Sequence, residues 1–266
     1  ATAAALAARR RQPCLGGMAL TGPATGVTLC SEQNGCLQRV DMAALQRLAA
    51  SGGFHVALLV TPGALVVASR PLALITADAG QLKPIDHAAL RKAFIIGALR
   101  QFDDDPRFGV VVLAEIASRA LSPGINDPGT AIAVLSSLQR LFAAWDASDG
   151  PDAEAPLYDR IAVPPLAIGD LFDDAFPAIA RDSAGMVEVA ERVQRILGEL
   201  GHGSASHLRG AARRHAALAM ARAERALDFP PDRQQVRRRH ADYWPLADGV
   251  GQHMTQRGRA TTVAER

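Results

Sequence analysis

The sequence predicts an α+β fold, in which a small β-rich N-terminal module is followed by a mainly helical region. Two patterns favour this class. Between residues 27 and 80, runs of β-branched residues are broken by Pro62-Gly63, which is typical of strands joined by turns. After Pro84, apolar residues recur at steps of three and four almost to the end of the chain, as in helices with one buried face. With 266 residues, 48% of them hydrophobic, the chain is long enough to bury a core.

The N-terminal part divides into two segments. Residues 1–26 show no sustained periodicity and predict a flexible leading segment. In the β-rich module, residues 27–80, we expect extended segments at 36–40, 54–60 and 64–75, and Asp41 can cap a short helix. Two strands around a Pro-Gly turn are similar to half of a biotinyl or lipoyl carrier, but that chemistry needs an exposed lysine. Residues 1–82 contain none, so a covalent carrier is excluded and a structural or docking role remains.

The helical region divides at residues 147–156, where Asp, Gly, Ala and Pro replace the periodic pattern and predict a surface loop or hinge. Before it lies a helical core at 81–146, and after it a second helical region at 157–246 with one extended stretch at 158–165. Residues 247–266 are polar, basic and Gly-bearing, and predict a disordered tail. Helices are expected at 86–102, 105–121, 127–145, 168–180, 183–200 and 204–227.

The most distinctive segment is the loop at residues 121–131, which reads LSPGINDPGTA. Asp105-Pro106 and Asp127-Pro128 begin the helices on its two sides, because Asp caps free backbone N–H groups and Pro suits the first helical position. Such an elaborate loop is a candidate ligand-binding surface. The candidate residues are Arg107, Glu115, Arg119, Ser122, Asn126, Asp127 and Thr130.

Two interpretations of this loop remain open. In the first, Arg119 and Ser122 join the N–H groups of Gly129 and Thr130 to bind a phosphate or carboxylate. Against it, Asp127 occupies those donors and repels an anion. In the second, the motif is structural: Asn126 and Asp127 cap the helix, Pro123-Gly124 forms the turn, and Arg119 pairs with Glu115 one helical turn earlier.

Other chemical patterns are weak. Asp103, Asp104 and Asp105 offer oxygen ligands for Mg²⁺ or Ca²⁺ if Glu115 or Asp127 approaches, but consecutive side chains diverge and Asp105 is a cap, so we expect a solvated helix junction. No metal site, cofactor or catalytic residue is assigned. There is no phosphate-binding glycine loop and no nucleophile elbow. Three cysteines, Cys14, Cys30 and Cys36, are expected as free thiols, and seven histidines lack metal spacing: His55, His87, His202, His207, His215, His240 and His253.

The basic residues are nearly all arginine, because Lys83 and Lys92 are the only lysines. Nine arginines lie between His202 and His240 against three acids, so a basic helix could approach lipid headgroups, or the arginines could be an ordinary solvated face. The net charge of +2 and the lack of interleaved aromatic residues argue against nucleic acid.

The order of these segments resembles the DUF2254 family of predicted bacterial membrane proteins, whose activity is undefined. The resemblance covers about residues 30–245. It implies several membrane spans before a soluble region, with the spans absent from this chain. The chain departs from the family pattern at Gly35-Cys36 and Ser69-Arg70. The matching residues are Gly35, Leu37-Gln38, Val40-Asp41, Pro62-Gly63, Val67, Pro71-Leu72, Phe108-Gly109, the run 119–128 and Thr130-Ala131.

The leading functional expectation is a non-enzymatic regulatory, scaffolding or ligand-sensing module attached to the inner membrane. The alternatives are a divalent-metal-dependent hydrolase and the soluble part of a transporter or channel. Every apolar run is too short to cross a bilayer. The partners expected are the membrane, through the missing spans, and an anionic ligand or lipid headgroups. Arg9, Arg10 and Arg11 near the preceding span indicate the cytoplasmic side.

Overall fold

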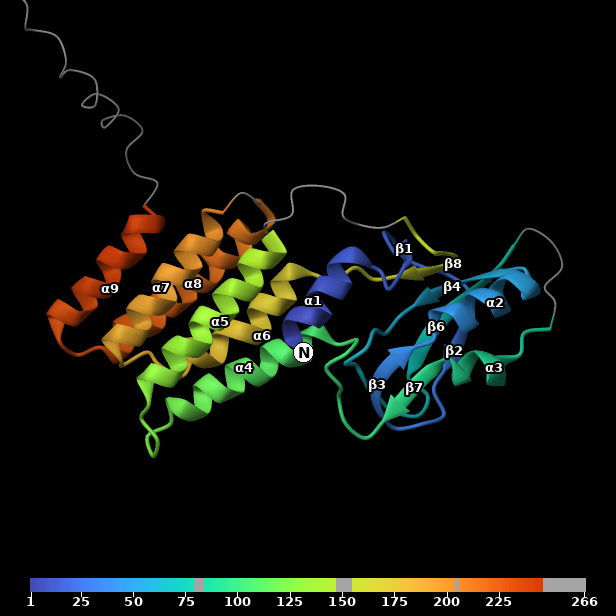
Figure 1. The fold of residues 1–266 in the computed structure, drawn as a ribbon, viewed down its shortest axis with the longest axis horizontal. Helices are drawn as coiled ribbons and strands as arrows, with labels where there is room; N and C mark the ends of the chain where they lie inside the picture. Colours follow the sequence, from blue (N-terminus) through green and yellow to red (C-terminus); the bar gives the residue numbers. More distant parts are fainter. Residues whose placement is uncertain (79–83, 147–154, 204–205, 246–266) are drawn as a thin grey trace, which may run out of the picture.

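The chain forms an elongated α+β molecule, with a β-rich part at one end and a bundle of helices at the other (Figure 1). The computed structural model describes residues 1–78, 84–146, 155–203 and 206–245. The predicted fold class is therefore confirmed. Within the described residues, no helix combines the length and the apolar character that crossing a membrane requires.

The β-rich part contains two sheets. In the larger sheet the strand order is β1-β8-β4-β6-β2, and in the smaller it is β5-β3-β7. Strand β4 pairs antiparallel with β6 and parallel with β8. The strands of the larger sheet are β1 (Gly17–Ala19), β8 (Tyr158–Val163), β4 (Phe54–Leu58), β6 (Pro71–Ala77) and β2 (Val27–Cys30); those of the smaller are β5 (Leu65–Val66), β3 (Gly35–Val40) and β7 (Phe94–Gly97).

Helix α2 (Met42–Gly52) packs on β4 and β8, and it begins where predicted, at Asp41. The Asp41 carboxylate accepts a hydrogen bond of 2.9 Å from the backbone N–H of Ala44. The extended stretch predicted at 158–165 is β8, which lies between β1 and β4. The chain thus returns to the larger sheet after two long helices. The exact domain boundaries stay a prediction.

Two local predictions are wrong. Residues 1–26 are not without regular structure, because α1 (Thr2–Arg11) and β1 lie within them. An alanine-rich stretch favours a helix, and Leu6 anchors α1 in the helical core. The helix predicted at 86–102 is only α3 (His87–Lys92), followed by β7. Here the apolar run Phe94–Gly97 pairs with β3, so sheet formation overrides the helical spacing.

The helices predicted at 105–121, 127–145, 168–180, 183–200 and 204–227 are confirmed, and one helix that was not predicted follows them. Phe142, Phe172 and Phe176 meet at the centre of their core, with ring centroids 4.6–5.9 Å apart. The predicted tail at 247–266 and most of the loop at 147–156 lie outside the described residues. The helices are α4 (Pro106–Ala120), α5 (Pro128–Asp146), α6 (Ile168–Asp182), α7 (Val187–Gly201), α8 (Ser206–Ala226) and α9 (Pro230–Tyr243).

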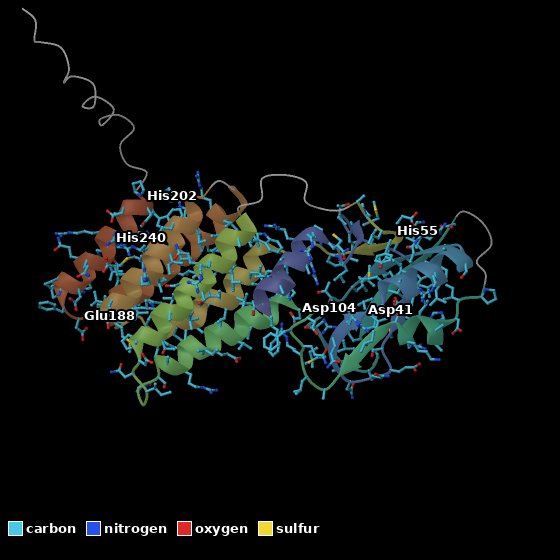
Figure 2. The ribbon with its side chains drawn as sticks, in the orientation of Figure 1. Asp41, His55, Asp104, Glu188, His202 and His240 are labelled. Carbon is cyan, nitrogen blue, oxygen red and sulfur yellow. The ribbon has the colours of Figure 1, made fainter. Side chains whose placement is uncertain are left out.

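A polar junction joins the two parts at the start of α4. The buried carboxylate of Asp105 caps α4 by accepting from the N–H of Phe108, and it pairs with Arg100 at 2.7 Å. The turn at Gly63, from the β-rich part, lies against the same carboxylate. Arg9 of α1 is buried beside them and donates to the carbonyl of Asp104, which Figure 2 shows between the two parts. Asp105 is thus a cap, as predicted.

Candidate functional site

The loop between α4 and α5 folds as a compact turn at the end of the helical part far from the sheets (Figure 1). The carbonyl of Ser122 accepts from the N–H groups of Ile125 and Asn126, and the N–H of Asp127 donates to Ala120 at 2.8 Å. Asn126 holds a left-handed conformation, with φ of +50°, which asparagine tolerates better than most residues. These bonds fix the loop with its own backbone.

Asp127 caps α5, as the structural interpretation predicted. Its carboxylate accepts from the N–H of Thr130 at 3.0 Å and from the Thr130 hydroxyl at 2.5 Å. The hydroxyl and then the backbone bond favour the charged form, so the pKa of Asp127 lies below its ordinary value. The negative charge therefore sits on the helix N-terminus, where a bound anion would otherwise go.

Beside the cap lies an open hollow of about 440 Å³, which we call the corner hollow. Its volume falls within the range of small-molecule sites. Ile116 and Ile125 give it an apolar wall, although they are 45% and 55% exposed. Its lining residues are Val112, Glu115, Ile116, Arg119, Ala120, Ile125, Asp127 and Thr130.

Asp127 is engaged as the cap of α5, but the two other charged side chains of the corner hollow, Glu115 and Arg119, are not paired among the described residues. Glu115 and Arg119 are both exposed and lie one turn apart on α4. The predicted pair between them is wrong: no ion pair joins them, and neither has an ion-pair partner within the described part of the chain. The cost of holding two long side chains together in water can outweigh such a weak attraction. Both groups are therefore available to a ligand.

The structure gathers four of the seven candidate residues around the hollow: Glu115, Arg119, Asp127 and Thr130. Ser122 and Asn126 belong to the loop but not to the lining, and the Ser122 hydroxyl donates to the carbonyl of Arg119 at 2.7 Å. Ser122 and Asn126 therefore contribute to the turn and do not line the hollow.

Arg107 lies at the opposite end of α4, about 20 Å away by helix length. It pairs there with Asp174 at 2.7 Å and Asp170 at 2.9 Å, both on α6. The hydrogen bonds that Arg107 donates to Asp174 are the main cause of the raised pKa of Arg107. Arg107 is thus a structural link between helices and does not belong to the candidate site.

The structure does not bring the candidate oxygen ligands for a divalent metal ion together. Asp103, Asp104 and Asp105 precede α4, whereas Glu115 lies in the second half of α4 and Asp127 lies beyond its end. Among the described residues, no group of three His, Cys, Asp or Glu side chains is placed to hold a metal ion.

Sequence reasoning missed the apolar wall of the hollow. Val112, Ile116 and Ala120 repeat every four residues and so form one stripe on α4, adjacent to Glu115 and Arg119. Exposed Ile116 could have been suspected from its place beside two charged positions. Ile125 entered the sequence analysis only as part of the loop at residues 121–131. Its position beside the apolar residues of α4 depends on how that loop folds.

The histidines are dispersed through the fold. Figure 2 shows His55 in the β-rich part and His202 and His240 in the helical part. His215 is buried against Phe172 and Phe176, and its Nε2 lies 3.0 Å from a carboxylate oxygen of Asp173. Burial lowers the pKa of His215. These contacts indicate packing, not acid-base chemistry.

A second and slightly larger hollow, of about 470 Å³, lies between α3, β7 and the segment that follows β2. Arg91 spans its wall, with one bond to the carbonyl of Cys30 and an ion pair of 2.9 Å to Glu32. Since Arg91 is already held by protein groups, we place the candidate site at the corner hollow.

The chain resembles known proteins in sequence. The profile of the family described as "Predicted membrane protein (DUF2254)" matches residues 5–199. Two proteins described as uncharacterized, one from Mycobacterium bovis and one from Mycobacterium tuberculosis, are each 34% identical over 134 residues, which is 49% of this chain and 26% of the relative. The chain thus matches about a quarter of the length of these relatives. No solved structure matches it significantly. Since the profile covers well over half of the sequence, the chain belongs to the DUF2254 family of predicted membrane proteins.

Proposed function

We propose that this chain is a regulatory, ligand-sensing domain of a membrane protein, and that the corner hollow is its ligand site. One observation carries the proposal. Glu115 and Arg119 carry opposite charges beside an apolar wall, and no ion pair joins them. An apolar wall with a few polar groups beside it is the usual composition of a small-molecule site.

The chemistry of the hollow favours a small zwitterion with an apolar body. Arg119 can receive a carboxylate, because its planar guanidinium suits that group. Glu115 can receive an ammonium group, and Ile116 and Ile125 can cover an aliphatic or aromatic side chain. Simple anions fit less well, because Glu115 and Asp127 together outweigh the charge of Arg119.

Helix α4 connects the corner hollow with the N-terminal helix α1, so it could transmit a shift caused by a bound ligand. Its first residue, Pro106, follows the junction cap Asp105, and Gly109 one turn later lies directly against Thr2 of α1. In this proposal the membrane spans precede residue 1, on the side of α1, and the domain faces the cytoplasm. A ligand that shifts α4 would then move the segment that leads toward the spans.

Thermal unfolding of the 266-residue chain with defined probes tests the site. The probes are leucine, phenylalanine, inorganic phosphate, Mg²⁺ and Ca²⁺. At 100 times its dissociation constant, a ligand adds about 2.7 kcal/mol and raises the midpoint by several degrees. We expect a shift with an apolar amino acid that Arg119→Ala and Glu115→Gln abolish.

Arg238→Ala is the matched control, because Arg238 is also exposed but lies on α9. It should keep the shift. A shift that survives Arg119→Ala, or no shift with any amino acid, would contradict the proposed site. A shift with Mg²⁺ or Ca²⁺ alone would favour the metal-enzyme alternative instead.

A further inference from the structure

The outer surface of α8 carries a row of arginines together with two exposed apolar residues. Arg214, Leu218, Arg222 and Arg225 follow at steps of four, four and three, so they line up along one face of the helix. Phe229 follows three residues after the end of α8, at the N-cap of α9. We call these five residues the α8 stripe.

The apolar members of the α8 stripe are unusually exposed. Leu218 is 47% exposed and Phe229 is 61% exposed. Most of Phe229 thus lies outside the protein's own core. Its burial would require another surface.

The charge of the α8 stripe is of one sign and largely free. Arg222 and Arg225 have no ion-pair partner within the described residues, whereas Arg214 pairs with Asp173 at 3.0 Å. The nearby acid Glu224 is held by Arg237 of α9, on the other flank of α8. Two further acids lie close to the stripe in sequence, Asp228 beside Phe229 and Asp232 three residues after it. The stripe therefore has a net positive charge.

We propose that the α8 stripe rests on an anionic lipid bilayer, with its arginines at the headgroups and with Leu218 and Phe229 inserted between them. Basic residues interleaved with exposed apolar ones along a helix surface suit this interface. The chain belongs to a family of predicted membrane proteins, so a bilayer would be held close to it. The inference concerns a surface outside the corner hollow and does not depend on the ligand proposed there.

Vesicle co-sedimentation of the 266-residue chain tests this surface. One set of vesicles contains only neutral phosphatidylcholine. The other contains phosphatidylcholine with about 30 mole per cent of the anionic lipid phosphatidylglycerol. We expect binding to the anionic vesicles only, and weaker binding as salt rises. Arg222→Gln with Arg225→Gln should weaken binding about 30-fold, since each lost charge near the surface is worth about a factor of five. Phe229→Ser should weaken it further.

The matched control removes two exposed arginines elsewhere, Arg47 on α2 and Arg238 on α9, by Arg47→Gln with Arg238→Gln. It should bind the anionic vesicles as the parent does. Equal binding to neutral vesicles, equal loss in the control, or no vesicle binding by the parent would overturn the proposal. So would binding of a DNA duplex, measured by fluorescence anisotropy, without binding of vesicles. None of these results bears on Arg119, which the ligand assay tests without lipid.

Discussion

Gly63 lies directly against the carboxylate of Asp105, so the turn of the β-rich part and the first cap of the helical bundle touch each other. A Cβ built on Gly63 would lie 2.7 Å from the Cγ of Asp105, which is shorter than side chains tolerate. Gly63 also has a φ of +96°, where an L side chain is strained. The contact requires glycine for two independent reasons.

Gly63→Ala should therefore lower the free energy of unfolding by about 2–4 kcal/mol, because it adds backbone strain to an overlap with a buried carboxylate. Urea unfolding followed by circular dichroism measures the change. Gly22→Ala is the matched control, because a Cβ there meets no heavy atom within 4 Å. If both substitutions cost the same, the contact at Gly63 is unimportant.

Asp105→Ala should cost more than Asp41→Ala. Both residues cap a helix, and a lost cap costs about 1 kcal/mol. Asp105 is in addition 2% exposed and pairs with Arg100, so its removal leaves a partly buried guanidinium without its partner. We expect a loss of about 2–4 kcal/mol against about 1 kcal/mol at Asp41, measured by urea unfolding. Equal losses would show that the pair with Arg100 adds nothing.

The features that the sequence predicted well are local ones. Asp41, Asp105 and Asp127 each cap the helix that was expected to follow them, because a cap needs only the residue and the next turn of backbone. The long helices were equally visible, since each carries its own apolar period.

The features that it missed depend on distant partners. Phe94–Gly97 becomes a strand only because β3 lies beside it, more than fifty residues earlier in the chain. Arg107 was grouped with the loop, yet its carboxylate partners lie 63 and 67 residues away on α6. Glu115 and Arg119 have the spacing of an ion pair, and spacing alone cannot decide whether solvent competes for them.

Stability should decrease as the pH falls from 7.5 to 5.5. Burial lowers the pKa of His215 and of His240 below the ordinary value near 6.5. The unfolded chain then binds more protons than the folded chain in this window, so acid favours unfolding. Each group can contribute at most about 1.4 kcal/mol per pH unit. Urea unfolding at several pH values measures the slope.

His215→Gln and His240→Gln are the matched variants for this pH dependence. Glutamine keeps an N–H donor, for Asp173 in one case and for Gln194 in the other, but it does not titrate. The double variant should show a flatter profile between pH 5.5 and 7.5. An unchanged profile would assign the slope to other groups.

Arg107→Ala and Arg119→Ala should separate structure from ligand binding. Arg107 joins α4 to α6 through two carboxylates, one of them by two parallel bonds to Asp174, so its loss should destabilise the fold by about 1–2 kcal/mol after allowance for its partial exposure. Arg119 has no such partner within the described residues, and its loss should change stability by less than about 0.5 kcal/mol.

The ligand response should show the reverse order. Arg107→Ala should keep the thermal shift produced by an apolar amino acid, because Arg107 lies at the far end of α4 from the corner hollow. Arg119→Ala should lose that shift while it unfolds at the parent's midpoint without ligand. Both variants are compared by the same thermal scan with and without the amino acid. If Arg119→Ala instead melts early and Arg107→Ala loses the shift, the loop is a structural cap and the ligand binds near α6.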